Sequence, residues 1–97
     1  MNGVRKVYNE SQKLNSEEVY QNGILLRQRT YYENGAIYQD NLVRDNQKHG
    51  TCKGYYPSGF LKYTRNYVDG KRHGAEVLWD QDGNQMVRNK YRDDVKI

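Results

Sequence analysis

The stretch "YYPSGFLKY" (residues 55–63) decides the fold of this 97-residue chain. Pro57 has a fixed φ that suits the second position of a type I β-turn, and Gly59 takes the last position of that turn. A type I turn that ends in a left-handed glycine forms the three-residue hairpin loop with a bulge. The stretch therefore predicts two cross-strand pairs: Tyr56 with Phe60, and Tyr55 with Leu61.

The same turn recurs at a fixed interval of 24 residues. The stretch "YYENGAIYQ" starts at residue 31, and "WDQDGNQMV" starts at residue 79. The turn glycines are Gly35, Gly59 and Gly83, and the aromatic residues four positions before them are Tyr31, Tyr55 and Trp79. Further along each unit, "KHG" (48–50) matches "RHG" (72–74). A period of this kind indicates a tandem array of one supersecondary unit.

The period divides the single domain, residues 1–97, into units of roughly 8–31, 32–55, 56–79 and 80–97. The first unit is degenerate, with Ser11 in place of the turn glycine, and the last is partial. Runs rich in Tyr, Val and Thr between Gly-containing turns are typical of strands joined by hairpins. We therefore predict an all-β fold: an open antiparallel meander of about eight strands, essentially a single layer, with a long axis of about 35–40 Å.

Side-chain alternation along the strands assigns the residues to two faces. We expect one face to hold neighbouring hairpins together as the core side; it carries Tyr55, Leu61, Tyr63 and Tyr67, with their equivalents Tyr31, Ile37, Val43, Val77, Trp79, Val87 and Tyr91. The other face mixes aromatic and basic residues. Our candidate partner-binding residues on it are Tyr32, Tyr38, Tyr56, Phe60, Lys62, Leu78 and Arg88.

The charges are interleaved. The chain has 16 basic and 12 acidic residues, a net charge of +4, and no long basic run of the kind found in nucleic-acid tails or membrane anchors. Cys52 is the only cysteine, which excludes an intramolecular disulfide and fits a reducing compartment. No apolar stretch approaches the length of a transmembrane segment, and the first residues lack the apolar region of a signal peptide. We expect a soluble, cytoplasmic protein.

Residues with catalytic or metal-binding chemistry are sparse. His49 and His73 occupy the same position in successive units, about 10 Å apart in a linear array, so we interpret them as turn residues rather than ligands of one metal ion. We interpret Cys52 as a packed strand residue and the repeated aspartates as turn formers. The sequence predicts no catalytic residue, no metal and no cofactor, and hence no enzyme.

The segments "YPSGFL", "YVDGKRHG" and "YENGAI" resemble the MORN-type repeats, and in particular their bacterial variant. The resemblance covers residues 31–91 well and 8–30 weakly, and departs from the pattern at Asn46 and Gln85. It implies an array of β-hairpins that contacts proteins and sometimes lipids. Bacterial members are often labelled as antitoxin components, which would imply a protein that neutralises an enzyme.

These observations leave several partners open. We favour a protein partner, a toxin or another enzyme, that an antitoxin, immunity or inhibitor protein would cover with its sheet. The mixed face could also pair with a second copy of the chain in a homodimer. Nucleic acid is less favoured, although aromatic and basic residues together are typical of sheets that bind single strands. A lipid or membrane-surface scaffold is the last alternative.

Overall fold

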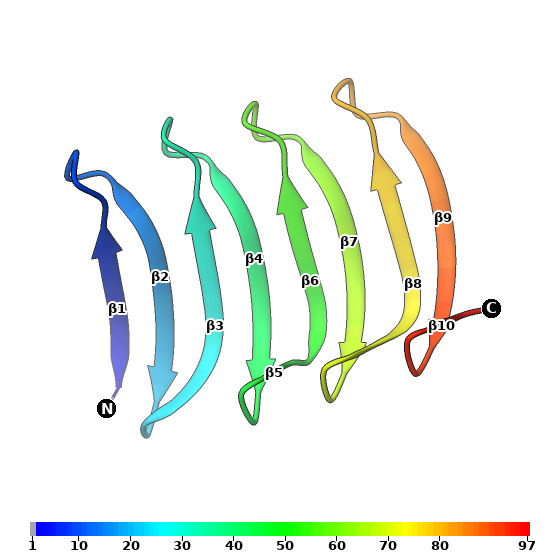
Figure 1. Ribbon diagram of the computed structural model, residues 1–97, viewed down its shortest axis with the longest axis horizontal. Coiled ribbons are helices and arrows are strands. Elements are labelled where there is room, and N and C mark those ends of the chain that lie inside the picture. Colours follow the sequence, from blue (N-terminus) through cyan, green and yellow to red (C-terminus); the bar gives the residue numbers. More distant parts are fainter. Residues whose placement is uncertain (1) are drawn as a thin grey trace.

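The computed structural model describes residues 2–97, which form one open antiparallel sheet and contain no helix (Figure 1). The strands are β1 (Gly3–Tyr8), β2 (Leu14–Gln21), β3 (Ile24–Tyr31), β4 (Ile37–Arg44), β5 (Gln47–Lys48), β6 (Gly50–Tyr55), β7 (Leu61–Val68), β8 (Lys71–Trp79), β9 (Gln85–Arg92) and β10 (Val95–Lys96).

The strands follow one another across the sheet in chain order. The path runs β1-β2-β3-β4-β6-β7-β8-β9-β10, and the two-residue strand β5 folds back on the end of β4. The molecule measures 40 × 33 × 16 Å, so its thickness is that of a single layer with its side chains. The predicted all-β meander is confirmed, including its length, with eight main strands and two short ones.

The upper turns in Figure 1 have the predicted hairpin geometry. The Tyr56 N–H donates to the Phe60 carbonyl (2.8 Å), the Gly59 N–H donates to the Tyr56 carbonyl (2.8 Å), and Gly59 has φ +95°. Tyr55 lies opposite Leu61. The equivalent pairs in the other hairpins are Tyr8–Leu14, Tyr31–Ile37 and Trp79–Gln85.

The first hairpin is as complete as the others, and its left-handed residue is Gln12 (φ 61°) rather than Ser11. The Gln12 N–H donates to the Asn9 carbonyl, as Gly59 does to Tyr56. The first unit is one residue shorter than the period, so Ser11 was the wrong match for the turn glycine. A non-glycine residue holds this turn because the Asn9 side chain accepts hydrogen bonds from the N–H groups of Ser11 and Lys13.

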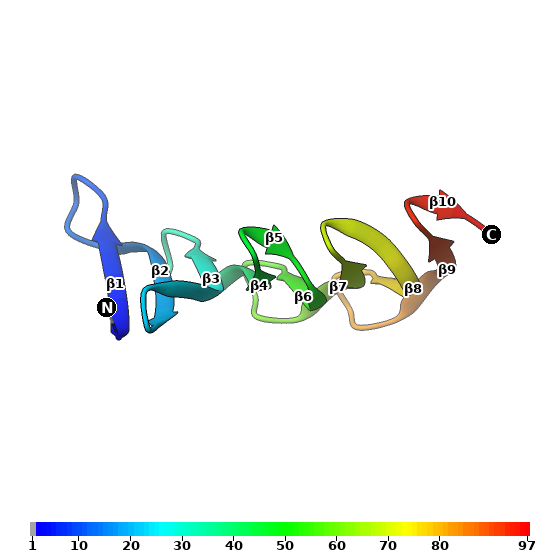
Figure 2. The same ribbon diagram turned by 90° about the horizontal axis from the view of Figure 1, so that it is seen from below.

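The lower turns are two-residue loops with left-handed φ at both positions. They are Asn22-Gly23, Asp45-Asn46, Asp69-Gly70 and Asp93-Asp94. Such loops match the right-handed twist of the sheet, and Asn, Asp and Gly tolerate them best. Neighbouring hairpins are joined here, since the Gly70 N–H donates to the Lys48 carbonyl (2.9 Å). Figure 2 shows β5 and β10 on one side of the sheet and the β6–β7 and β8–β9 turns on the other.

A bulge below every upper turn overturns the predicted division of the faces. Gly54 lies opposite Tyr63, but the next residue, Tyr55, lies opposite Leu61, so Lys62 is an extra residue on its strand. Neighbouring residues of an unbulged strand face opposite ways. Tyr63 and Leu61, opposite Gly54 and Tyr55, therefore lie on different faces. The extra residues of the four hairpins are Asn15, Tyr38, Lys62 and Met86.

We call one side the network face; it carries Gln39, Cys52, Gly54, Tyr63, Arg65, Glu76, Leu78, Val87 and Asn89. The opposite face carries Lys53, Tyr55, Thr64, Val77 and Arg88. The predicted core set is divided between them: Val43, Tyr63, Tyr67, Val87 and Tyr91 lie on the network face, and Tyr31, Ile37, Tyr55, Leu61, Val77 and Trp79 on the opposite face. The prediction of one core side was wrong because alternation does not continue through a bulge.

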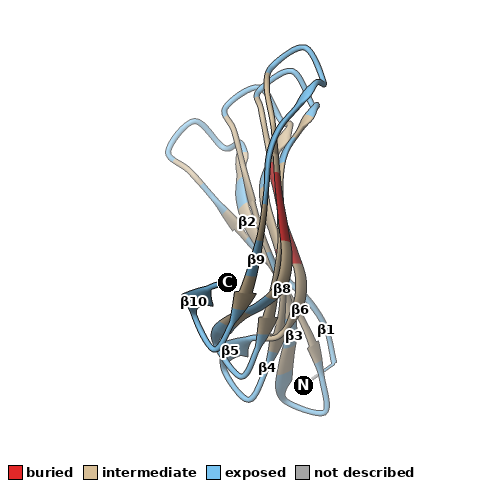
Figure 3. Ribbon diagram, turned by 90° about the vertical axis from the view of Figure 1, so that its right-hand side faces the viewer, coloured by how far each residue is buried: buried red, intermediate tan, exposed pale blue. Residues whose placement is uncertain are grey.

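The buried residues are few (Figure 3). Among the described residues, Cys52 and Val77 are the buried hydrophobic side chains, and Asn41 and Glu76 are buried although polar. A single layer has no second sheet to cover either side. Hydrogen bonds and partly covered aromatic rings take the place of a dry core.

Candidate interaction surface

A shallow hollow of about 360 Å³ lies on the network face across β4 and β7–β9. Its lining residues are Tyr38, Gln39, Tyr56, Lys62, Tyr63, Arg65, Leu78, Trp79 and Met86. Three of these, Tyr38, Lys62 and Met86, are the extra residues of three successive hairpins. The bulges therefore place one protruding side chain per repeat around the hollow.

These bulge residues differ in chemistry and are all exposed. Tyr38 is 43% exposed and Met86 is 58% exposed, and Lys62 stands between them in the repeat series. Equivalent positions of neighbouring repeats are two strands apart, on the order of 10 Å. The three side chains thus offer an aromatic, a cationic and a flexible apolar group in one row.

Two tyrosines at the upper turns tie the hairpins together. The Tyr32 hydroxyl donates to the Tyr55 carbonyl and the Tyr56 hydroxyl donates to the Trp79 carbonyl, each at 2.7 Å. Tyr32 also packs edge-on against Tyr38, with ring centroids 5.0 Å apart. The upper wall of the hollow is therefore fixed by hydrogen bonds one repeat apart.

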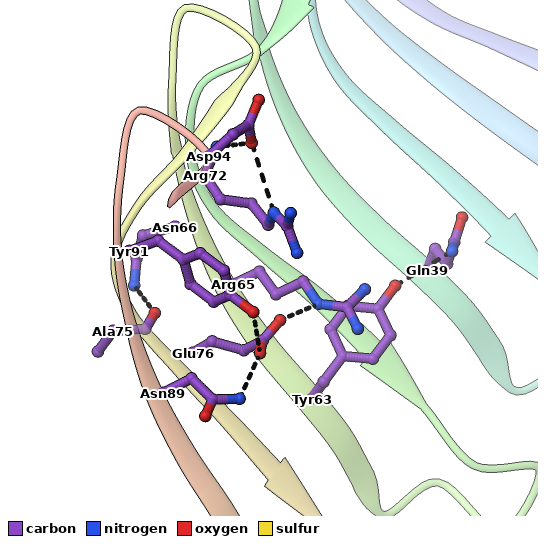
Figure 4. A network of polar contacts seen from close by, with 10 residues as sticks. All are labelled: Gln39, Tyr63, Arg65, Asn66, Arg72, Ala75, Glu76, Asn89, Tyr91 and Asp94. Carbon is purple, nitrogen blue, oxygen red and sulfur yellow. Dashed lines mark hydrogen bonds and ion pairs between the residues drawn. The ribbon is translucent and has the colours of Figure 1, made fainter. Parts of the chain in front are cut away.

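The floor of the hollow is a polar network drawn in Figure 4. Gln39 donates to the Tyr63 hydroxyl (3.1 Å), and the guanidinium of Arg65 lies 4.1 Å from the centre of the Tyr63 ring. Arg65 Nε donates to Glu76 Oε2 at 2.6 Å. The ring, the cation and the carboxylate thus form a continuous layer across β7 and β8.

Glu76 is the buried centre of this network, with 5% of its surface exposed. It also accepts hydrogen bonds from Asn89 Nδ2 (2.9 Å) and the Tyr91 hydroxyl (3.4 Å). Burial raises the pKa of Glu76. Hydrogen bonds from Asn89 and Arg65, together with the Arg65 charge, lower it by more than burial raises it, so the pKa lies below its usual value. The Arg65–Glu76 pair leaves the floor charge-balanced, and the exposed side chains stand on the rim.

The structure brings together four of the seven candidate binding residues. Tyr38, Tyr56, Lys62 and Leu78 line the hollow, and Tyr32 touches Tyr38 beside it. Phe60 is 52% exposed at the β6–β7 turn, outside the lining. Arg88 lies opposite Val77 and Leu78 lies opposite Val87, so Arg88 is on the opposite face. Its assignment to the same face as Leu78 was wrong because the bulge at Met86 shifts the alternation.

Gln39, Tyr63, Arg65, Trp79 and Met86 were not among the candidates. A glycine in the middle of a predicted strand, Gly54, was the available signal for a close approach at Tyr63. Arg65 meets Glu76 on the neighbouring strand β8, and only the register between the two strands shows that these residues lie opposite each other.

The histidines and the cysteine lie in structural positions. His49 Nδ1 accepts a hydrogen bond from the Asp69 N–H (3.2 Å) and so supports the next lower turn, and His73 is exposed. Cys52 is 1% exposed, and burial raises the pKa of its thiol, which disfavours the reactive thiolate. Within residues 2–97, no three His, Cys, Asp or Glu side chains gather closely enough to hold a metal ion.

A search of residues 2–97 for a helix long and apolar enough to cross a bilayer found none.

Comparison with family models gave one match, to part of the chain. Residues 48–69 match the family model described as the MORN repeat variant. The match runs from β5 through β6 and the Pro57–Gly59 turn into β7, so it covers one complete hairpin. Comparisons with curated proteins and with solved structures gave no match. Residues 48–69 are thus similar to a MORN repeat variant, a kind of repeat typical of binding modules in general.

Proposed function

We propose that this protein is a non-enzymatic module that binds another protein through the hollow on the network face. The observation that carries the proposal is the row of bulge residues. Three successive repeats each contribute one exposed side chain, Tyr38, Lys62 or Met86, to the rim of one hollow. Tyr and Arg side chains, which are enriched in protein hot spots, also lie in its lining.

The surroundings suit a protein partner in size and stiffness. The sheet spans 40 by 33 Å, enough for an interface of the usual size, about 800 Å² per partner. The hydrogen bonds of Tyr32 and Tyr56 fix the walls before binding, so little conformational entropy is lost on association. The net charge of +4 favours encounter with an acidic partner surface.

We further propose that the partner is an enzyme and that this protein is its antitoxin, immunity protein or inhibitor. A stiff sheet with a hollow can cover a convex active-site rim and exclude substrate without any chemistry of its own. Inhibition would then follow from occupancy, and inhibitory potency would track binding affinity.

The test starts with the full chain as bait in a lysate of its source cell. The captured enzyme is then purified, and its affinity and its inhibition are measured against Tyr38→Ala and Met86→Ala. We expect each variant to weaken binding about tenfold or more, as for truncated hot-spot residues. Ile24→Ala is the control, because Ile24 is 56% exposed at the lower β2–β3 turn and outside the hollow. Unchanged affinity for both rim variants would exclude the hollow as the binding site.

A further inference from the structure

The opposite face carries a charge gradient along the repeats. Glu17, Asp40, Thr64 and Arg88 occupy equivalent positions on β2, β4, β7 and β9, 23, 24 and 24 residues apart. The side chain at this position is thus acidic twice, then neutral, then basic. The backbone of the four repeats is equivalent at this position, so the change of side-chain charge gives the C-terminal end of the array a different surface from the N-terminal end.

The acidic residues are matched by bases in the first half of the sheet. Glu17 lies opposite Arg29, and Arg29 lies opposite Asp40. Asp40 forms ion pairs with Arg27 Nε (3.3 Å) and Arg29 Nε (3.2 Å). The charges on the opposite face of β2–β4 are therefore largely neutralised within the molecule.

In the second half of the same face, Arg88 and Lys90 lie opposite Val77 and Ala75 rather than opposite acids, whereas Lys53 lies opposite Asp40. Lys53, Arg88 and Lys90 are exposed, and none forms an ion pair with any other part of residues 2–97. The register places small residues between them, since Lys53 lies opposite Thr64, Thr64 opposite Val77, and Val77 opposite Arg88. We call this surface the basic trough: Lys53, Thr64, Ala75, Val77, Arg88 and Lys90.

A depression adjoins the basic end of the trough, and its lining includes Asn89 of the network face as well as trough residues. This depression of about 480 Å³ is lined by Ala75, Arg88, Asn89, Lys90, Lys96 and Ile97. Arg88 and Lys90 are two residues apart on one strand, so their side chains leave the same face roughly 6.8 Å apart. This spacing equals that of alternate side chains in an extended peptide.

We propose that the basic trough binds an extended acidic segment of a protein, with carboxylates at alternate positions opposite Arg88 and Lys90. The inference goes beyond the proposed function, because it uses the other face of the sheet. An acidic peptide fits better than nucleic acid. Tyr55 and Trp79, on this face, are half-buried and lie opposite Leu61 and Gln85, which leaves no fully open ring on which bases could stack.

The chain offers a matched pair of reporters for the test. Val77 and Leu78 are adjacent on β8 and point to opposite faces, so their methyl resonances report on each face separately. The probe is an eight-residue peptide of alternating Glu and Val, titrated into the full chain and followed by methyl NMR. We expect shifts at Val77 and not at Leu78, and an affinity that falls with added salt.

Variants and control ligands complete the design. Arg88→Glu with Lys90→Glu should weaken peptide binding at least tenfold, and Arg88→Gln, which nearly keeps the side-chain volume, should weaken it less. Lys13→Glu, in the β1–β2 turn and outside both the trough and the hollow, should leave binding unchanged. Equal binding of a peptide with Gln in place of Glu, tighter binding of an eight-nucleotide oligothymidylate, or shifts confined to Leu78 would each overturn the proposal. None of these measurements involves the captured enzyme. A negative result here would therefore reject the peptide-binding trough and leave the test of the proposed function unaffected.

Discussion

The ring of Tyr63 on β7 lies directly over the backbone of Gly54 on β6. A Cβ atom added to Gly54 would overlap Cε2 and Cζ of that ring. Gly54 is not among the glycines with left-handed φ, so the close approach of Tyr63 is what requires a glycine here. The ring in turn stacks with Arg65, and the Tyr63 hydroxyl accepts a hydrogen bond from Gln39. This single contact therefore sets the floor of the hollow.

Gly54→Ala should destabilise the fold by about 1–3 kcal/mol, as overpacking does, in urea denaturation. The cause is checked by a double variant. In a Tyr63→Ala background the clash is gone, and Gly54→Ala should be neutral or stabilising, because alanine suits a strand better than glycine. Gly35→Ala is the control: no atom lies near its Cβ position, so the Tyr63 background should not alter its cost. A cost of Gly54→Ala that persists without the ring would disprove the steric explanation.

Glu76→Gln should cost about 2 kcal/mol, because it leaves the partly buried Arg65 without its counter-charge. Glu18→Gln is the matched control. Glu18 also pairs with an arginine across two strands, but Arg5 is 59% exposed, so the cost should stay below about 1 kcal/mol. Equal losses in the two variants would show that the network adds no stability beyond that of a surface ion pair.

The same carboxylate makes stability depend on acid pH. The pKa of Glu76 is lower in the folded chain than its ordinary value of 4.5. Its contribution is therefore complete above pH 4.5 and is lost as the pH falls below 4.5 through the folded pKa. The free energy of unfolding of wild type minus Glu76→Gln, measured by urea denaturation at several pH values, should shrink below pH 4.5. A difference that stays constant down to pH 2 would contradict this.

Tyr31 should impose the opposite dependence at high pH. Burial, a hydrogen bond to Glu17 and the charge of that carboxylate raise the pKa of Tyr31 to about 12. Because the unfolded phenol ionises near its ordinary value of 10, the contribution is complete below pH 10 and is lost between pH 10 and 12. NMR of ring-labelled tyrosine should show this late titration. Tyr31→Phe should flatten the stability profile above pH 10, whereas Tyr8→Phe, at an exposed ring, should not.

Tyr56→Phe should separate the structural role of Tyr56 from binding. It removes the hydrogen bond to the Trp79 carbonyl and keeps the ring, so we expect a loss of about 1 kcal/mol in thermal or urea unfolding. Tyr38→Phe is the control, because the Tyr38 hydroxyl donates no hydrogen bond to any described residue. A Tyr56→Phe variant as stable as Tyr38→Phe would show that the hydroxyl does not join the hairpins.

Much of the local structure could be predicted from the sequence. Pro57 and Gly59 specify their turn through φ alone, and they fix the pairs Tyr56–Phe60 and Tyr55–Leu61. The 24-residue period then predicts the meander and its length. Even the degenerate first unit follows the rule, with Gln12 taking the left-handed position because Asn9 caps the turn.

The candidate site could be predicted only in part. Tyr38, Tyr56, Lys62 and Leu78 were identified as a mixed surface, but Arg88 lies on the other side of the sheet. A one-residue bulge leaves no clear mark in the pattern of apolar and polar residues. Beyond the bulge, every side chain of the strand points to the face opposite to the one expected from simple alternation. Counting the alternation from the turn therefore places distant residues on the wrong face.

The sequence by itself therefore determined the elements: turns, strands, order and period, all of which depend on local φ preferences and repetition. The tertiary structure decided which side chains meet. The bulges at Asn15, Tyr38, Lys62 and Met86 arise from pairing between strands, and the burial of Glu76 depends on residues from β7 and β9. In a single-layer sheet, where few residues are buried, the register rather than a hydrophobic core decides which side chains form a surface.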